Sequence, residues 1–221
     1  MTGKSPEKTG QNDAGLVPWS VLDEAFFAQR TVLFTGEVEE KLCSLTAHRL
    51  MSLQYASMEP ITLIIDSRGG EMDEALKLCD IMATLIKAPI RGIAVGKCGS
   101  AATFVMLYCD ERLGTPNARF VIHSARRVRV TVPANATASE HLEQLLKETA
   151  ATERQIERLY VERLTPARKG KMTPAQKLAF VRKLIARGDQ AFDASMTAEE
   201  AIAAGLIQGV FNGKLDFMPQ A

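Results

Sequence analysis

Short apolar runs alternate with longer segments of helical spacing through the first half of the chain. Three runs rich in aliphatic and β-branched residues predict buried strands at 31–34, 61–65 and 90–95. Two longer segments, whose apolar positions recur three or four residues apart, predict helices at 37–58 and 72–86. Strands that alternate with helices, with few hairpin signals between them, indicate parallel crossovers and therefore an α/β core.

Glycines mark the expected ends of two of these strands. Gly36 is expected to stop the first strand, and Gly69 with Gly70 is expected to form a turn after the second. Ligands of parallel α/β sheets bind where strands end and helices begin, so this turn is a candidate binding position. It lacks the lysine–serine pair and the glycine spacing of phosphate-binding loops. A plain turn is one interpretation, and close approach of an extended peptide or an oxyanion is the other.

The second half of the chain consists of longer amphipathic segments joined by basic, polar stretches. Residues 126–132 alternate basic and β-branched side chains, which predicts an exposed strand. A long helix is predicted at 138–163, and a second amphipathic helix at 174–187 is expected to end at Gly188. Two further elements are expected near the end of the sequence: a helix at 198–204 and a strand at 207–211.

Composition bounds the class of protein. With 221 residues, 46% hydrophobic and 24% charged, the chain can bury one sizeable core, and a single domain is favoured. A formal net charge of +1 argues against a general binder of polyanions. The basic stretches at 126–129 and 168–171 carry no interleaved aromatic residues, so they predict solvated faces and no nucleic acid partner.

The first 18 residues and the cysteines point to a cytoplasmic protein. Residues 1–18 are largely polar, without the apolar region of a secretory signal, and predict a disordered lead-in. No apolar run approaches the roughly 20 residues of a membrane helix, so no membrane partner is expected. The four cysteines lie in or beside apolar runs without the spacing of a zinc site, which favours reduced, packed thiols and no metal.

A single serine stands where a strand runs into a small-residue turn. Ser100 follows the apolar strand and the segment GKCG, and an apolar helix is predicted after it at 103–107. Small neighbours let a substrate approach the hydroxyl, and a helix beginning after Ser100 would direct free N–H groups toward a developing oxyanion. A serine hydroxyl becomes a good nucleophile only when a base takes its proton. The alternative is an ordinary helix-capping serine.

His123 closes the next apolar run and is the candidate base. The other two histidines are not candidates for the base. His48, within the first long helix, is expected to be structural, and His141, at a polar helix start, is expected to be solvated. A lone histidine at the end of an apolar strand is also compatible with a buried polar group that has no catalytic role. A third group must orient the imidazole, and the pattern alone leaves four candidates open: Asp66, Asp73, Asp189 and Asp193.

Four segments, in this order, resemble motifs of one family. Residues 64–70 resemble a strand followed by an S-P-G-G turn, and residues 96–104 resemble G-x-A-A-S-M-G-A-F. Residues 113–123 resemble the L-P-N-S-R-x-M-I-H segment. Residues 189–207 resemble D-x-x-x-D followed by a S/T-A-x-E-A-x-x-x-G-L segment. From about residue 21 to residue 211 the chain resembles the proteolytic subunit of the ATP-dependent Clp protease (ClpP).

The resemblance implies roles for particular residues. Carried over position by position, it makes Ser100 the nucleophile, His123 the general base and Asp189 the orienting acid, while Asp193 falls on the family's second, non-catalytic acid. The backbone N–H groups of Gly70 and Ala101 match the positions that form the family's oxyanion hole. No cofactor and no metal are implied.

The resemblance also implies a fold and an assembly. The expected fold is the ClpP/crotonase-like stack of strand–helix units, with 19–221 as one protease domain and the helix at 138–163 as the handle that joins two rings. Heptameric rings would stack into a tetradecamer, fed with unfolded polypeptides by a hexameric AAA+ unfoldase. The expected activity is that of an ATP-dependent serine endopeptidase in which the partner hydrolyses the nucleotide.

Departures from the family pattern leave a non-catalytic subunit open as one alternative, and the expected fold leaves a second one open. Arg68 replaces the proline of the glycine turn, and Ser124 with Ala125 replaces the family's Q-P after the histidine. A basic helical segment at about 166–187 is added between the handle and Asp189. One alternative is a non-catalytic ring subunit that pairs with an active paralogue, and the other is a crotonase-type acyl-CoA enzyme.

Overall fold

The computed structural model describes residues 19–125, 138–167, 171–190 and 194–214, and the structural findings concern these residues. The lead-in expected at 1–18, the exposed strand expected at 126–132 and the candidate acid Asp193 lie outside the described residues.

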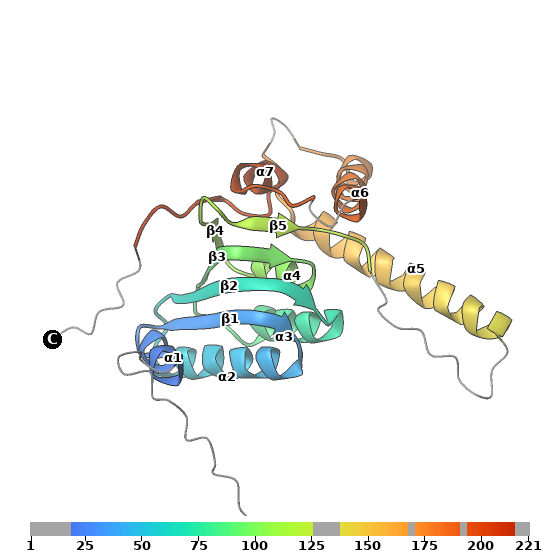
Figure 1. Cartoon of the computed structure of the whole chain (residues 1–221). Helices are drawn as coiled ribbons and strands as arrows, with labels where there is room; N and C mark the ends of the chain where they lie inside the picture. Colours follow the sequence, from blue (N-terminus) through green and yellow to red (C-terminus); the bar gives the residue numbers. More distant parts are fainter. Residues whose placement is uncertain (1–18, 126–137, 168–170, 191–193, 215–221) are drawn as a thin grey trace, which may run out of the picture.

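A parallel β-sheet forms the centre of the molecule (Figure 1). Its strands run in the order β1-β2-β3-β4-β6, and β5 pairs with β3 beyond the end of β4. The strands are β1 (Thr31–Val38), β2 (Ile61–Gly70), β3 (Ile90–Gly99), β4 (Glu111–Gly114), β5 (Arg119–Val121) and β6 (Gly209–Val210). Every named pair is parallel, which confirms the α/β class that the alternation of apolar runs predicts.

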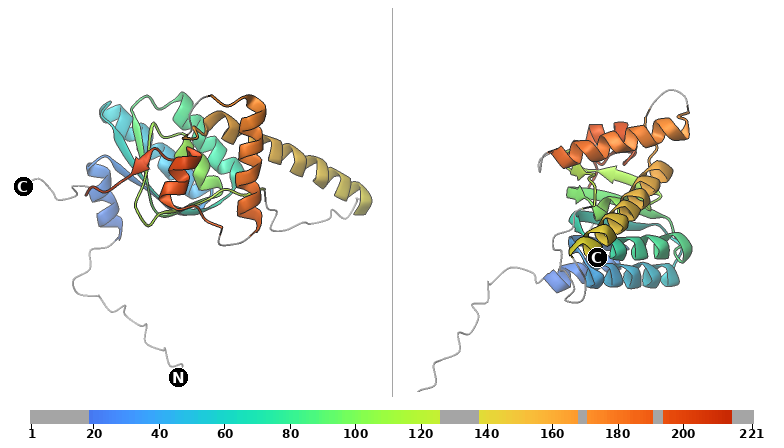
Figure 2. Two further views of the ribbon diagram at one scale, coloured as in Figure 1. Left: turned by 90° about the horizontal axis from the view of Figure 1, so that it is seen from above. Right: turned by 90° about the vertical axis from the view of Figure 1, so that its right-hand side faces the viewer.

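Helices supply the crossovers between these strands. They are α1 (Trp19–Ala28), α2 (Glu40–Ala56), α3 (Met72–Thr84), α4 (Ala101–Leu107), α5 (Ala138–Arg163), α6 (Pro174–Gln190) and α7 (Ala198–Ala204). Helices α2 and α3 pack side by side along one face of the sheet, and α5 projects well beyond it (Figures 1 and 2). Helix α6 packs against α5.

The core is deepest around the short helix α4. All seven residues of α4 are buried, because it is enclosed by β2, β3, α3 and the C-terminal half of α5. From α5, the side chains of Ile156, Leu159 and Tyr160 are buried in this core. Burial of apolar area at about 25 cal/mol per Å² makes such a contact strongly stabilising. Among the described residues, nothing comparable covers the N-terminal half of α5, and Leu142 and Leu146 there are 57% and 62% exposed.

Several expected element boundaries are wrong. Gly36 lies inside β1, where the register shifts between Thr35 and Glu37, because its left-handed φ of 105° accommodates a bulge rather than ending the strand. Gly69 and Gly70 are the last residues of β2, paired with β1, and do not form a separate turn.

Helix α6 begins at Pro174, as its amphipathic pattern predicts, which is eight residues after the start expected for the added basic segment, and it continues through Gly188 to Gln190. The final strand is only Gly209–Val210. Gly188 serves close packing, since a Cβ there would lie 1.9 Å from the carbonyl oxygen of Ile122. Local sequence cannot distinguish a glycine that ends a helix from one that lets a helix contact another backbone.

Within the described ranges, no helix is both long and apolar enough to span a membrane. The same ranges contain no group of three or more histidine, cysteine or acidic residues arranged to hold a metal ion.

Candidate active site

Ser100 lies between the end of β3 and the first turn of α4, in a backbone conformation that is rare for residues other than glycine. Its φ is 52° and its ψ is −129°, a combination that residues other than glycine adopt only when the surroundings enforce it. The Ser100 N–H donates to the carbonyl of Val121 at 2.8 Å. Ser100 occupies the N-cap position, yet its hydroxyl makes no capping hydrogen bond, which excludes the helix-cap interpretation.

The glycines of β2 allow the strand to press against Ser100. A Cβ on Gly69 would lie 2.5 Å from Cβ of Ser100 and 2.7 Å from the carbonyl oxygen of Gly99. A Cβ on Gly70 would lie 2.3 Å from the carbonyl oxygen of Val38, on the other side of β2. The end of β2 therefore packs between β1 and the backbone around Ser100, so closely that only glycine fits at both positions.

The two predicted oxyanion donors lie near the serine. Gly70 and Ala101 line the same cavity as Ser100. Ala101 is the first residue of α4, so its N–H has no carbonyl acceptor within the helix. Their use as an oxyanion hole remains a prediction.

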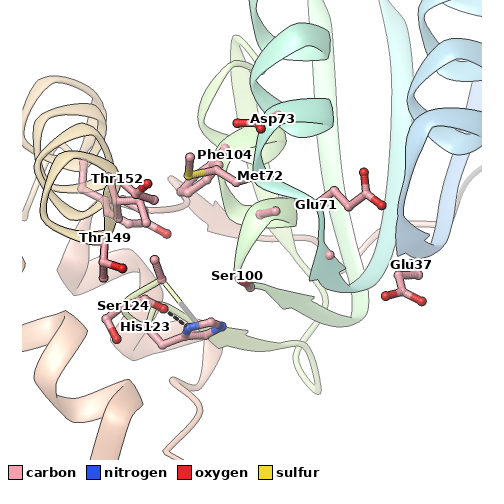
Figure 3. Close-up of a pocket in the computed structure, with 15 residues that line it drawn as sticks. Glu37, Glu71, Met72, Asp73, Ser100, Phe104, His123, Ser124, Thr149 and Thr152 are labelled. Carbon is pink, nitrogen blue, oxygen red and sulfur yellow. Dashed lines mark hydrogen bonds between the residues drawn. The ribbon is translucent and has the colours of Figure 1, made fainter. Parts of the chain in front are cut away.

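His123 follows β5 by two residues, and its tautomer can be assigned from its partner. The ring atom Nδ1 lies 2.5 Å from the carbonyl oxygen of Ser124 (Figure 3). A carbonyl oxygen only accepts, so the proton is assigned to Nδ1, and in the neutral ring the lone pair then resides on Nε2. This is the tautomer that a base taking a proton through Nε2 requires.

Ser100 and His123 line one cavity, which brings together two of the predicted residues. No hydrogen bond joins their side chains among the described residues. Such bonds are commonly long without substrate and shorten in the reacting complex. His48, expected to be structural, is exposed on α2.

Asp189 reaches the histidine segment through Ser124. It lies in the last turn of α6, and its Oδ1 accepts hydrogen bonds from the N–H and the hydroxyl of Ser124, both at 3.0 Å. Ser124 thus contacts both Asp189 and His123. Gly188, packed on the backbone of Ile122, sets the approach of α6 to this segment.

Two of the other candidate acids are placed differently. The Oδ1 atom of Asp66 accepts from the backbone N–H of Lys97 at 2.9 Å and so supports the β3 backbone near Gly96. Asp73 lies in the first turn of α3 at the opposite wall of the cavity. Of the acids that the structure describes, Asp189 is the one whose hydrogen bonds reach the residue after His123.

The cavity beside Ser100 has a volume of about 490 Å³ and a mixed lining. Figure 3 shows the imidazole of His123 near Ser100, with Thr149 and Thr152 of α5 across from the acidic side chains Glu37 and Glu71. Apolar side chains form another part of the wall: Met72, Phe104, Ile156 and Tyr160. A second cavity of about 930 Å³ also reaches Ser100 and His123 and is lined by Arg68 and Lys97. An extended chain therefore has space on both sides of the serine.

Sequence reasoning missed three contributors to this site. Thr103 and Tyr160 form a buried hydrogen-bonded pair next to Ser100, and Ser124 bridges Asp189 and His123. From the sequence, Ser124 stands out only as a departure from a family pattern, and Thr103 and Tyr160 have no assigned role. No local signal could have identified the contact of Thr103 with Tyr160 or that of Ser124 with Asp189, because each joins residues distant in the chain.

The cysteines take no part in the site. All four are free and buried, as predicted. Burial raises the pKa of Cys43 to about 11 and that of Cys109 to about 12. Thiols with such pKa values carry almost no thiolate at neutral pH, so they are poor nucleophiles.

Comparison with known proteins gives one consistent result. A family model described as Clp protease matches residues 18–214. The chain is 32% identical over 119 residues to ATP-dependent Clp protease proteolytic subunit 2 of Treponema denticola, covering 52% of this chain and 56% of that protein. It is 31% identical over 120 residues to the protein of the same name from Treponema pallidum, covering 53% of this chain and 58% of that protein. The matched part spans about half the length of these curated relatives.

A solved structure agrees on the fold. A ClpP1 mutant from Listeria monocytogenes superposes with a TM-score of 0.67 at 24% identity, covering 87% of this chain and 97% of that one. At this identity the likeness concerns the fold, and it confirms the expected stack of strand–helix units.

Proposed function

The chain belongs to the Clp protease family as a divergent ClpP-type proteolytic subunit, and from that premise we propose that it is a serine endopeptidase with Ser100 as its nucleophile. The observation that carries the proposal is the shared cavity of Ser100 and His123, with the Nδ1 proton of His123 held by the carbonyl of Ser124. That hydrogen bond leaves Nε2 as the acceptor on the imidazole, which is what a general base for a serine needs.

In this proposal the site performs acyl transfer to water in two steps. His123 takes the proton of the Ser100 hydroxyl as the oxygen attacks the peptide carbonyl, and then gives that proton to the departing amine. Water, activated by the same imidazole, releases the acyl group from Ser100. The N–H groups of Gly70 and Ala101 bind the oxyanion of each tetrahedral intermediate.

Asp189 is proposed as the acid of the set, acting from the end of α6. Its two hydrogen bonds with Ser124 hold the residue whose carbonyl fixes the His123 tautomer. Its negative charge also favours the imidazolium that forms when His123 takes the proton.

We propose that the working particle is a cytoplasmic ring assembly, two heptameric rings stacked as a tetradecamer, fed with unfolded polypeptides by an AAA+ unfoldase. Family membership supports the assembly. The exposed leucines Leu142 and Leu146 on the projecting half of α5 support its use as a handle between rings, because a second copy would cover them.

Fluorophosphonate labelling of the purified full-length protein tests the proposal. The wild type should be labelled and should hydrolyse short peptides, and Ser100→Ala should abolish both. His123→Ala should lower the labelling rate at least 100-fold, whereas the matched controls Ser57→Ala and His48→Ala should leave it unchanged. Labelling that survives in Ser100→Ala would overturn the assignment of the nucleophile.

Two other outcomes would redirect the proposal. An inactive wild type that gains activity when mixed with an active paralogue would identify a non-catalytic ring subunit. Binding of an acyl-CoA ester in the cavity would identify crotonase-type chemistry.

A further inference from the structure

A buried chain of hydrogen bonds links α5 to the backbone of Ser100. The hydroxyl of Tyr160 lies 2.7 Å from Oγ1 of Thr103, and Oγ1 of Thr103 lies 2.6 Å from the carbonyl oxygen of Ser100. Tyr160 is 1% exposed and Thr103 is 0% exposed.

The donor directions in this chain follow from its last member. The carbonyl of Ser100 can only accept, so the hydroxyl of Thr103 donates to it. The hydroxyl of Thr103 has then used its proton, so the hydroxyl of Tyr160 donates to Thr103. The backbone N–H of Thr103 donates to the same carbonyl at 2.9 Å. Thr103 therefore holds the carbonyl of Ser100 with two hydrogen bonds, and Tyr160 orients one of them.

The carbonyl of Ser100 and the N–H of Ala101 belong to one peptide unit. That unit is rigid and planar, and in a trans peptide its C=O and N–H point in opposite directions. No peptide bond in the described residues is cis. Fixing the direction of the Ser100 carbonyl therefore fixes the direction of the Ala101 N–H.

The fixation matters because the local backbone is strained. A serine at a φ of 52° and a ψ of −129° needs external contacts to stay there. The bond from Ser100 N–H to Val121 holds one side of the residue, and the bonds from Thr103 hold the other. The ring of Tyr160 is itself placed by an edge-to-face contact with Phe104, with the ring centroids 5.5 Å apart.

We propose that Thr103 and Tyr160 are positioning residues that aim the N–H of Ala101 at the oxyanion of the reacting peptide. The inference rests on the proposed serine peptidase function and adds two residues to its machinery. Neither residue is proposed to touch the reacting atoms through its hydroxyl. Burial raises the pKa of Tyr160, so its hydroxyl stays protonated across the working pH range and does not titrate during turnover.

Kinetics of four variants of the full-length protein in its native assembly test the proposal. Loss of an oxyanion donor lowers kcat by about 10²- to 10³-fold in serine peptidases, and a misaimed donor should cost part of that. Tyr160→Phe, which keeps the ring and its packing, should lower kcat about 10-fold with KM within twofold. Thr103→Val should lower kcat about 100-fold, and Thr103→Ser should restore it to within threefold of the wild type.

The fourth variant controls for the loss of a buried threonine hydroxyl. Thr46 is 1% exposed, and its hydroxyl donates to the carbonyl of Leu42 at 2.8 Å in α2, away from the cavity. Thr46→Val should leave kcat and KM unchanged even where it lowers the melting temperature as much as Thr103→Val does.

A peptide boronate reports the oxyanion hole directly, because its tetrahedral adduct with serine places an oxygen where the oxyanion forms. Affinity for the boronate should fall in Tyr160→Phe and Thr103→Val by the same factors as kcat. The double variant should be no worse than Thr103→Val alone, because the two hydroxyls act in series.

Three results would overturn the proposal. The first is that Tyr160→Phe and Thr103→Val have the same kcat as Thr46→Val. The second is that these two variants raise KM and leave kcat unchanged. The third is a wild type whose activity Ser100→Ala does not change, which would overturn the proposed function as well. If Thr103→Val fails to fold, Tyr160→Phe and Thr103→Ser decide the question.

Discussion

The two halves of the candidate site are built in different ways. Ser100 is held by backbone hydrogen bonds and buried neighbours, between the end of β3 and the fully buried helix α4. His123 lies just after the end of β5, and Asp189 lies in the last turn of α6, where its side chain is exposed. Both side chains form hydrogen bonds with one residue, Ser124. The nucleophile half thus depends on the packing of the fold, whereas the proton-relay half depends on a few polar contacts near the surface.

This difference predicts that variants of the nucleophile half lose stability and activity together. Variants of the relay half should lose activity at nearly constant stability. Three substitutions test the comparison, and a pH titration tests the packed core.

The largest effect is expected for Gly69→Ala. A methyl group there would overlap Cβ of Ser100 and the carbonyl of Gly99, at a residue whose φ is 102°. We expect a loss of about 2–4 kcal/mol in the free energy of unfolding, measured by denaturant titration, and loss of fluorophosphonate labelling. Gly36→Ala is the matched control, since Gly36 has nearly the same φ of 105° and no atom of the described residues lies within 4 Å of the added methyl. Equal stability in the two variants would contradict the close packing of β2 on Ser100.

The next effect is expected for Asp189→Asn, which tests the relay half. Replacing the acid of a serine triad by its amide lowers kcat by up to about 10⁴-fold, and we expect at least about 10²-fold here. The unfolding free energy should change by less than about 1 kcal/mol, because the side chain is exposed and the amide oxygen still accepts from Ser124. Asp110→Asn serves as the control, since Asp110 accepts from the backbone N–H of Ile90 outside the cavity. Full activity in Asp189→Asn would remove Asp189 from the mechanism.

A smaller effect is expected for Ser124→Ala. The change removes the hydroxyl that donates to Asp189 but keeps the backbone N–H donor and the carbonyl that faces His123. Loss of one hydrogen bond worth about 1 kcal/mol corresponds to a fall in kcat of about fivefold. Ser124→Thr, which keeps a hydroxyl, should recover most of the activity in steady-state peptide hydrolysis. A drop as large as that of Asp189→Asn would show that the hydroxyl itself is essential.

The smallest effect at neutral pH concerns the core thiols. Burial holds the pKa of Cys43 at about 11 and that of Cys109 at about 12, above the ordinary value of 9.0. The neutral thiols favour the folded state, so this stability is fully present below pH 9 and is lost as the pH rises toward 11–12. Denaturant titrations should show a decline above pH 9, by up to about 1.4 kcal/mol per pH unit for each thiol. Iodoacetamide at pH 7.5 should leave peptide hydrolysis intact, and rapid inhibition would contradict a serine-type site.

Much of the fold could be predicted from the sequence because its signals are local. Apolar runs and helical spacing predicted β1, β2, β3 and the helices between them, and the long helix at 138–163 coincides with α5. Three of the errors lie at glycines. As glycines, Gly36, Gly69 and Gly188 were expected to end a strand or a helix. In the structure Gly36 forms a bulge, Gly69 allows a close strand contact and Gly188 allows a close helix contact.

The candidate site was predictable only in part. Ser100 and His123 stood out as a serine in a small-residue turn and a histidine ending an apolar run, and the family resemblance selected Asp189 from four open acids. Gly70 and Ala101 lie beside the serine, and whether their N–H groups bind an oxyanion stays a prediction.

The sequence by itself determined the alternation of strands and helices, the order of the four motifs and the identity of the candidate nucleophile and base. Each of these depends on apolar periodicity or on short motifs, whose residues lie close together along the chain. The tertiary structure alone decided that β2 ends against Ser100, that Ser124 links Asp189 to His123, and that Tyr160 holds Thr103. The last two contacts join residues 65 and 57 positions apart. Contacts at that separation form only when packing brings the elements together, so no periodicity or spacing encodes them locally.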